Sequence, residues 1–209
     1  MRFPNTKGVL FDLDGTLIDS TPAIARSWSA VLTEIGIPLE VLPSLHGQPS
    51  RQSLHRLLPN ASLEEIDHWA KKIESLEVED TEGIILLPGA RELFEDLDRK
   101  EIEWFVVTSC TRELGTARAK SVGLTLPAKS IFFYDVEKGK PHPDPYLLGL
   151  ERLGIAADNA LVIEDAPAGI KSGKAAGIKV IAMVTTHERE SLNEADFIAD
   201  SLLDLAKLL

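Results

Sequence analysis

Short apolar runs alternate with longer amphipathic segments along this chain of 209 residues, a pattern typical of an α/β protein. The apolar runs have the length of buried strands and lie at residues 9–11, 104–107, 131–134, 161–163 and 179–183. Segments with helix start and stop signals separate them, at residues 90–100, 112–121 and 144–153. Strands that alternate with helices imply right-handed crossovers, so we expect a parallel sheet with helices on both faces.

A second region, residues 18–86, has a mostly helical pattern without a convincing buried strand. Thr21 should cap a helix whose first residue is Pro22 and which continues to about Ile35, where a glycine follows. Another should begin with Ser50 as its cap and continue to Leu58. The third is marked by a capping box and an apolar stripe, formed by Ser62, Glu65, Ile66, Trp69, Ile73 and Leu76.

These patterns predict a doubly wound, Rossmann-like parallel sheet with an inserted α-helical cap domain. The sheet domain would consist of residues 1–17 and 87–209, and the cap domain of residues 18–86. Open α/β sheets place their sites at the carboxyl ends of the strands. An insertion directly after the first strand would therefore cover such a site.

The composition restricts the partners and the compartment. The net charge of −11 argues against nucleic acid or an anionic membrane as a partner. A single cysteine, Cys110, excludes an internal disulfide and fits a reducing compartment. The first ten residues contain no apolar signal core. We therefore expect a cytoplasmic protein, a monomer, that acts on a small molecule.

Polar side chains follow the predicted strands or lie in the loops between core elements. They are Asp12, Asp14, Thr108, Ser109, Lys140, Glu164 and Asp165. Asp12 and Asp14 flank Leu13, and side chains two apart on a strand point the same way. Taken singly, each is most simply a solvated loop residue. Their joint placement on successive elements of one sheet is hard to obtain by chance.

These residue types suit phosphoryl transfer, which depends on positioning and on the stabilisation of charge. A carboxylate such as Asp12 can attack phosphorus where the charge of the phosphate is neutralised. Magnesium prefers oxygen ligands, and Asp12 and Asp165 offer carboxylates for it. Thr108, Ser109 and the ammonium group of Lys140 are suited to bind phosphate oxygens.

Four stretches resemble the motifs of the haloacid dehalogenase superfamily, whose members are mostly phosphatases with an aspartate nucleophile and magnesium. They are FDLDGTL, VVTS, GKPHPDPY and VIEDAPAGI, which begin at Phe11, Val106, Gly139 and Val162. The resemblance implies that Asp12 is the nucleophile and Asp14 the general acid and base. It implies a magnesium site of Asp12, the main-chain oxygen of Asp14, and Asp165, and a phosphate site of Thr108, Ser109 and Lys140.

Within the superfamily, the long spacing after Leu17 resembles the helical-cap class. The stretches EGIILLPGA and VTSCTRE resemble the sugar phosphatases, including the 2-deoxyglucose-6-phosphate and glycerol phosphatase group. The resemblance implies a magnesium-dependent phosphatase that hydrolyses small sugar or polyol phosphomonoesters through an aspartyl-phosphate. Cys110 departs from the expected pattern, and we interpret it as an inert buried residue.

Three further residues have open roles. Glu164 would be an acid near the metal, bound through water. The stretch SLHG resembles the cap loop of the glycerol and deoxyglucose phosphatases, which makes His46 and Arg51 candidates for substrate contact. Arg51 is alternatively a surface residue in the first turn of a helix.

Two other functions remain open from the sequence. A phosphosugar mutase of the β-phosphoglucomutase type would share the fold and motifs, with a basic residue in the cap loop for a second phosphate. His46 lies near the position of that basic residue, but the loop spacing from His46 to Arg51 differs from the mutase pattern. A non-catalytic phospho-ligand binder is the third possibility. It would be expected to have lost Asp12 or Asp14, and both are present.

Overall fold

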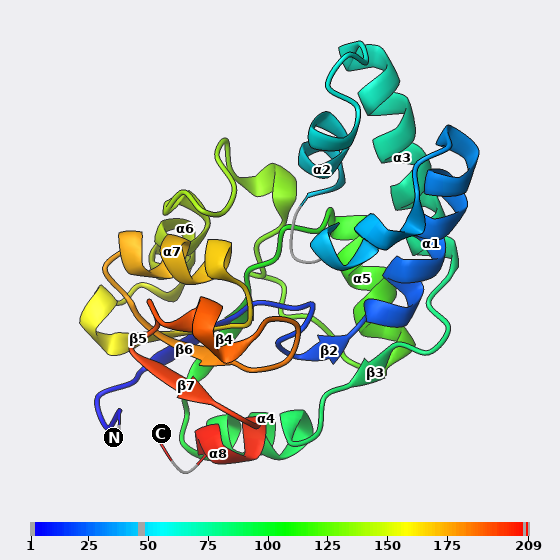
Figure 1. Cartoon of the computed structure of the whole chain (residues 1–209). Helices are drawn as coiled ribbons and strands as arrows, with labels where there is room; N and C mark the ends of the chain where they lie inside the picture. The colour runs from blue at the N-terminus through cyan, green and yellow to red at the C-terminus, as the bar shows by residue number, and fades with distance from the viewer. Residues whose placement is uncertain (1–2, 46–48, 207, 209) are drawn as a thin grey trace.

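A central parallel sheet organises the computed structural model, which describes residues 3–45, 49–206 and 208 (Figure 1). In these residues its strand order is β4-β1-β5-β6-β7. The strands are β1 (Gly8–Phe11), β4 (Glu103–Val106), β5 (Ala160–Glu164), β6 (Lys179–Met183) and β7 (Phe197–Ala199). Gly8 of β1 lies opposite Glu103 on one side and Ala160 on the other. The carboxyl ends of β1, β4 and β5 therefore meet at one edge of the sheet.

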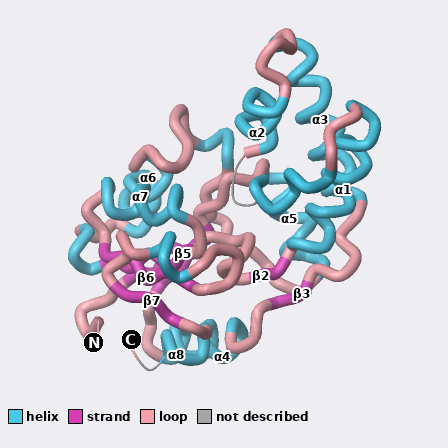
Figure 2. Tube along the Cα trace, in the orientation of Figure 1, coloured by secondary structure: helices cyan, strands magenta, loops and turns pink. Residues whose placement is uncertain are grey.

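The strands are buried on both faces because successive apolar residues contribute to different cores. Val9 and Phe11 belong to a core with α4 (Ala90–Arg99) and α8 (Leu202–Ala206). Leu10 belongs to the opposite core, with α6 (Asp144–Leu153) and α7 (Pro167–Ala175). Figure 2 shows these helices around the strands. The doubly wound arrangement predicted from the alternation of strands and helices is confirmed.

The inserted helices have a hydrophobic core of their own. They are α1 (Thr21–Ile35), the 3₁₀ segment η1 (Leu39–Leu45), α2 (Ser50–Leu57) and α3 (Leu63–Glu79). Their core contains Trp28, Val31, Leu32, Leu54, Ile66 and Ile73. They stand beside the sheet in Figure 1, and α3 packs on α5 (Arg112–Ser121).

Two short strands, β2 (Ile18–Asp19) and β3 (Ile85–Leu86), pair antiparallel where the chain enters and leaves this helical region. The expected domain boundaries, 17/18 and 86/87, coincide with the outer ends of this pair. The division into a sheet domain and a cap domain remains our proposal.

Three helix predictions are confirmed with small corrections. Helix α1 ends at Ile35 as predicted, but Thr21 is its first residue and Ser20 occupies the cap position expected for Thr21. In α3, Ser62 accepts a hydrogen bond from the Glu65 N–H at 3.1 Å. Ser50 is the first residue of α2 rather than its cap, because Pro49 occupies that position without a side-chain hydrogen bond. Helix α2 also ends at Leu57, one residue early.

The strand predicted at residues 131–134 is wrong. One isolated bridge joins Ile131 to Val107, and the chain then turns into the 3₁₀ segment η2 (Phe133–Asp135). The carboxylate of Asp135 accepts a hydrogen bond from the Phe132 N–H at 3.2 Å, which stabilises the turn in place of an extended strand.

Several short elements near the end of the chain and in loops were not predicted from the sequence. They are β7, α8, η1 and the 3₁₀ segments η3 (Ala157–Asn159) and η4 (Arg189–Leu192). Of the helices in the described residues, none is long and apolar enough to cross a membrane.

Candidate active site

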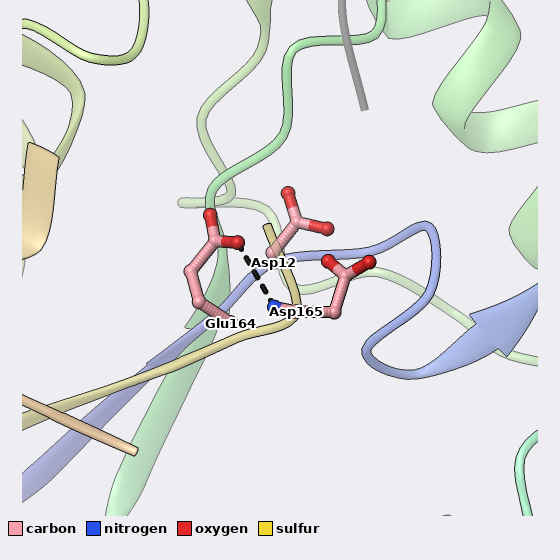
Figure 3. A group of neighbouring side chains, drawn as sticks. All are labelled: Asp12, Glu164 and Asp165. Carbon is pink, nitrogen blue, oxygen red and sulfur yellow. Dashed lines mark hydrogen bonds between the residues drawn. The ribbon is translucent and has the colours of Figure 1, made fainter. Parts of the chain in front are cut away.

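Three buried carboxylates meet where β1 and β5 end. Asp12 directly follows β1, Glu164 ends β5, and Asp165 is the next residue. One carboxylate oxygen from each lies within 4.8 Å of the others. Figure 3 shows these side chains converging from the two strand ends. The parallel register of the strands brings the sequence motifs together in this way.

Lys140, from the loop before α6, lies among these acids. Its Nζ atom is 2.6 Å from Asp12 Oδ1 and 2.6 Å from Glu164 Oε1, and it donates to the Val107 carbonyl at 2.8 Å. The buried hydroxyl of Tyr146 donates to the same Glu164 oxygen at 2.9 Å. Asp12, Lys140, Glu164 and Asp165 are called the strand-end cluster below.

The strand-end cluster has an excess of buried negative charge. Three carboxylates face one ammonium group, which leaves a formal charge of −2. Burial raises the pKa of Asp12, against the opposing effect of Lys140. Burial and the charge of Glu164 raise the pKa of Asp165 to about 7. A cation would relieve this unfavourable state, so the donor set fits a divalent metal.

The oxygens of Glu164 and Asp165 differ in their freedom to bind a cation. Glu164 Oε1 accepts from Lys140 and Tyr146, and its Oε2 accepts from the N–H groups of Asp165 and Ala166 at 3.0 and 3.2 Å. The oxygens of Asp165 accept only from side-chain hydroxyls among the described residues, those of Thr16 and Thr186. Asp165 is therefore the better direct ligand of the two.

Two glycines make room for these carboxylates. A Cβ atom on Gly169 would lie 1.6 Å from Glu164 Oε1, and one on Gly15 would lie 2.2 Å from Asp165 Oδ2. Gly15 also has φ of +82°, which disfavours other residues. Any side chain at either position would displace an acid of the cluster.

The side chain of Asp14 has different partners from that of Asp12. Its Oδ1 accepts from the Ser20 hydroxyl at 2.6 Å and lies 2.8 Å from Arg118 Nη1. Its Oδ2 accepts from the Cys110 thiol at 3.1 Å. The other guanidinium nitrogen, Arg118 Nη2, lies 3.0 Å from Glu77 Oε2. Asp14, Glu77, Cys110 and Arg118 are called the helix-wall cluster below.

Arg118 and Glu77 were not predicted from the sequence, although each leaves a detectable signal there. Arg118 lies on the buried side of α5, four residues after Leu114. Glu77 lies on the buried side of α3, four residues after Ile73. A charged residue within an apolar helical stripe is rarely buried without a partner. A pair of such residues on two helices would therefore have predicted a buried ion pair.

Burial affects the groups of the helix-wall cluster in different ways. It raises the pKa of Glu77 to about 7, although Arg118 opposes the rise. Burial also raises the pKa of the Cys110 thiol, and the charge of Asp14 adds to the effect. Burial by itself lowers the pKa of Arg118, but the negative charges of Asp14 and Glu77 outweigh it and raise the pKa.

A pocket lies between the strand ends and the inserted helices. Its sheet side includes Asp12, Asp14, Thr108, Ser109, Lys140, Glu164 and Asp165. Its helical side includes Trp28, Arg51, Lys71, Glu74 and Glu77. The structure thus brings every site residue predicted from the sequence to one pocket. The cap-loop candidate His46 lies outside the described residues.

Thr108 and Arg51 already have partners within the protein. The Thr108 hydroxyl accepts from the Cys110 N–H at 3.1 Å. The guanidinium of Arg51 lies 2.7 Å from Asp67, and its side chain is 52% exposed. Lys71 also lines the pocket, and the structure records no ion pair for it within the described residues. Lys71 is a pocket cation that the sequence analysis did not name.

Comparison with known proteins gives concordant results. The family profile of the haloacid dehalogenase-like hydrolases matches residues 9–183. Hexitol phosphatase A of Escherichia coli (strain K12) is 43% identical over 197 residues, which cover 94% of this chain and 91% of that protein. Glycerol-1-phosphate phosphohydrolase 2 of Saccharomyces cerevisiae is 36% identical over 196 residues, with 88% and 77% covered.

A solved structure, a hydrolase from Pseudomonas syringae, superimposes with a TM-score of 0.86 at 27% identity. The superposition covers 97% of both chains. The similarity therefore extends over the inserted helices as well as the sheet.

Proposed function

Because this chain belongs to the haloacid dehalogenase-like hydrolases, we propose that it is a phosphatase of small sugar and polyol phosphomonoesters. The observation that carries the proposal is the placement of Asp12, buried at a strand end and paired with Lys140 at 2.6 Å, at the base of a pocket. The 43% identity to a hexitol phosphatase supports hexitol monophosphates as the substrates to test first. A cytoplasmic monomer remains part of the proposal.

A divalent cation, for which we propose magnesium, would be held by Asp12, Asp165 and the main-chain oxygen of Asp14. When bound, it supplies positive charge to the phosphate oxygens and allows an anionic nucleophile to approach. The excess negative charge of the strand-end cluster supports this assignment.

The protein's own groups carry out the bond changes in two steps. In the first, a carboxylate oxygen of Asp12 forms a bond to phosphorus while the bond from phosphorus to the sugar oxygen breaks. Asp14 donates a proton to that leaving oxygen, so the alcohol departs neutral. Lys140, Thr108 and Ser109 orient the phosphate oxygens throughout.

In the second step, water attacks phosphorus of the aspartyl-phosphate. Asp14, now ionised, accepts a proton from this water, and the bond from phosphorus to the Asp12 oxygen breaks. Inorganic phosphate leaves, and both carboxyl groups return to their starting states. The inserted helices would exclude bulk water and contact the sugar or polyol.

The test is phosphate release from a panel of hexitol, hexose and glycerol monophosphates with magnesium and without any sugar bisphosphate. We expect steady release, fastest with a hexitol phosphate. Faster conversion of β-glucose 1-phosphate to glucose 6-phosphate than phosphate release would favour a mutase instead. Arg51, one candidate anchor for a second phosphate, is already paired with Asp67, which weighs against that outcome.

A further inference from the structure

Arg118 is a buried cation in the wall of the pocket, and the two steps above do not use it. Its side chain is 4% exposed. A buried guanidinium is unfavourable unless acids and hydrogen bonds compensate it. Two carboxylates compensate the charge of Arg118, namely Asp14 from the loop after β1 and Glu77 from α3. Arg118 thus joins three segments that are distant in the sequence.

The contacts of Asp14 distinguish its two oxygens. Oδ1 forms an ion pair with Arg118 Nη1 at 2.8 Å and accepts a hydrogen bond from the Ser20 hydroxyl at 2.6 Å. Oδ2 has a single partner within the described residues, the thiol of Cys110 at 3.1 Å, and a thiol is a weak donor. Proton exchange with a substrate or with water is therefore favoured at Oδ2, while Oδ1 serves to fix the carboxylate.

Glu77 restricts how Arg118 can move. A guanidinium is a rigid planar group, so holding Nη2 on Glu77 at 3.0 Å fixes the direction of Nη1 towards Asp14. A second polar contact joins the same two helices, because the Thr111 hydroxyl before α5 donates to Glu74 of α3. The packing of α3 on α5 therefore determines the orientation of Arg118.

We propose that Arg118 is the positioning residue for Asp14 and that Glu77 of the inserted helices completes the arrangement by fixing Arg118. The proposal rests on the proposed function, because Asp14 transfers protons only in that reaction. It makes Asp14 Oδ2 the proton-transferring atom. A lysine in place of Arg118 would keep the charge but lacks the two nitrogens that contact Asp14 and Glu77 separately.

The first test compares Arg118→Met with the control Arg112→Gln. Arg112 lies on the same helix, pairs with Asp135 and is 59% exposed. With a hexitol monophosphate and magnesium, Arg118→Met should lower kcat about 30-fold and change KM less than about twofold. Arg118→Lys should recover only part of kcat, and Arg112→Gln should match the wild type.

A burst experiment separates positioning from loss of folded protein. Nitrophenolate leaves without a proton donor, so p-nitrophenyl phosphate should still phosphorylate Asp12 in Arg118→Met. Hydrolysis of the aspartyl-phosphate needs Asp14 as a base and should be slow. We expect a burst of about one nitrophenolate per site, followed by a slow steady phase. A burst amplitude reduced in proportion to kcat would indicate a structural role and overturn the proposal.

The remaining outcomes are also decisive. If the wild type releases phosphate and Arg118→Met keeps its kcat, this inference fails and the proposed function stands. If the wild type releases no phosphate from any monoester, the proposed function fails.

Should Arg118→Met not fold, the variant Glu77→Gln provides the test. It keeps an acceptor for Arg118 but loses the charge, and we expect kcat to fall about threefold at unchanged KM. A wild-type kcat would contradict the proposal.

Discussion

The strand-end cluster and the helix-wall cluster line the same pocket, but they differ in how far their charges are balanced. The strand-end cluster holds three acids and one lysine, a formal charge of −2 within a small buried volume. The helix-wall cluster holds two acids and one arginine, a formal charge of −1. The first is incomplete without a cation, whereas the second is close to balanced. We infer that the strand-end cluster binds the cation and supplies the nucleophile, while Arg118 and Glu77 of the helix-wall cluster orient Asp14.

The origin of the two clusters also differs. The acids of the strand-end cluster are fixed by the register of parallel strands, so few other placements exist for them. The helix-wall cluster depends instead on how α3 packs on α5. The comparison predicts that changes in the strand-end cluster abolish phosphate release, and that changes at Arg118 or Glu77 in the helix-wall cluster only lower its rate.

Asp12→Asn should have the largest effect. An amide is a poor nucleophile and a weaker metal ligand, so we expect phosphate release to fall at least about 1,000-fold. The circular dichroism spectrum should remain that of the wild type, because removing one buried negative charge relieves repulsion. Near-normal hydrolysis by this variant would show that Asp12 is not the nucleophile.

Metal removal should have the next largest effect. A chelator should abolish turnover, and magnesium should restore it. Magnesium should also raise the melting temperature, since a ligand at 100 times its Kd stabilises the folded state by about 2.7 kcal/mol. Arg118→Met should retain this shift, because Arg118 contacts the side chain of Asp14 and not the main-chain oxygen proposed as a metal ligand. Turnover and melting temperature that are both indifferent to chelation would contradict the metal site.

The helix-wall cluster should make folding stability depend on pH through Glu77. In the unfolded chain Glu77 loses its proton near pH 4.5, whereas the folded protein retains it up to about pH 7. The folded state therefore binds more protons in this window, and the free energy of unfolding should fall as pH rises from about 5 to about 8. The raised pKa of Glu77 corresponds to a decrease of about 3 kcal/mol in the free energy of unfolding across this pH range.

The measurement is the free energy of unfolding from urea denaturation at about pH 5 and about pH 8, with magnesium present. Glu77→Gln cannot titrate and should lack this part of the decrease. Glu79→Gln, an exposed change on the same helix, should keep it. If the free energy of unfolding falls equally with pH in the wild type and in Glu77→Gln, the decrease does not come from Glu77.

The smallest effects should come from the pocket cations on the inserted helices. Lys71→Gln should raise KM for a hexitol phosphate about three- to fivefold, because its ammonium group is available to the substrate. Arg51→Gln should change KM less than about twofold, since Asp67 already holds the exposed guanidinium.

Lys72→Gln is the matched control for these cations, because Lys72 is adjacent in sequence but paired with Glu34. It should leave KM unchanged. A larger effect at Arg51 than at Lys71 would show that substrate binding breaks the pair with Asp67.

Local patterns were sufficient for most of the fold. The apolar runs of β1, β4, β5 and β6 and the signals at the helix ends identified the doubly wound sheet and the helical insertion. The pattern failed where a local contact opposed it. Residues 131–134 are apolar enough for a strand, but the carboxylate of Asp135 holds the chain in a turn. Strand β7 is only three residues long and gave no clear signal.

The sequence by itself determined which residues meet at the strand ends. Asp12 and Asp165 follow from motifs at the ends of parallel strands, because parallel strands bring their carboxyl ends to one edge, and Lys140 follows from the motif in the loop before α6. Only the tertiary structure decided what surrounds Asp14. Its partner Arg118 and the second anchor, Glu77, come from helices whose mutual position is set by packing over long separations. Sequence periodicity can show that such charges lie on buried faces, but the identity of each partner depends on how the two helices meet.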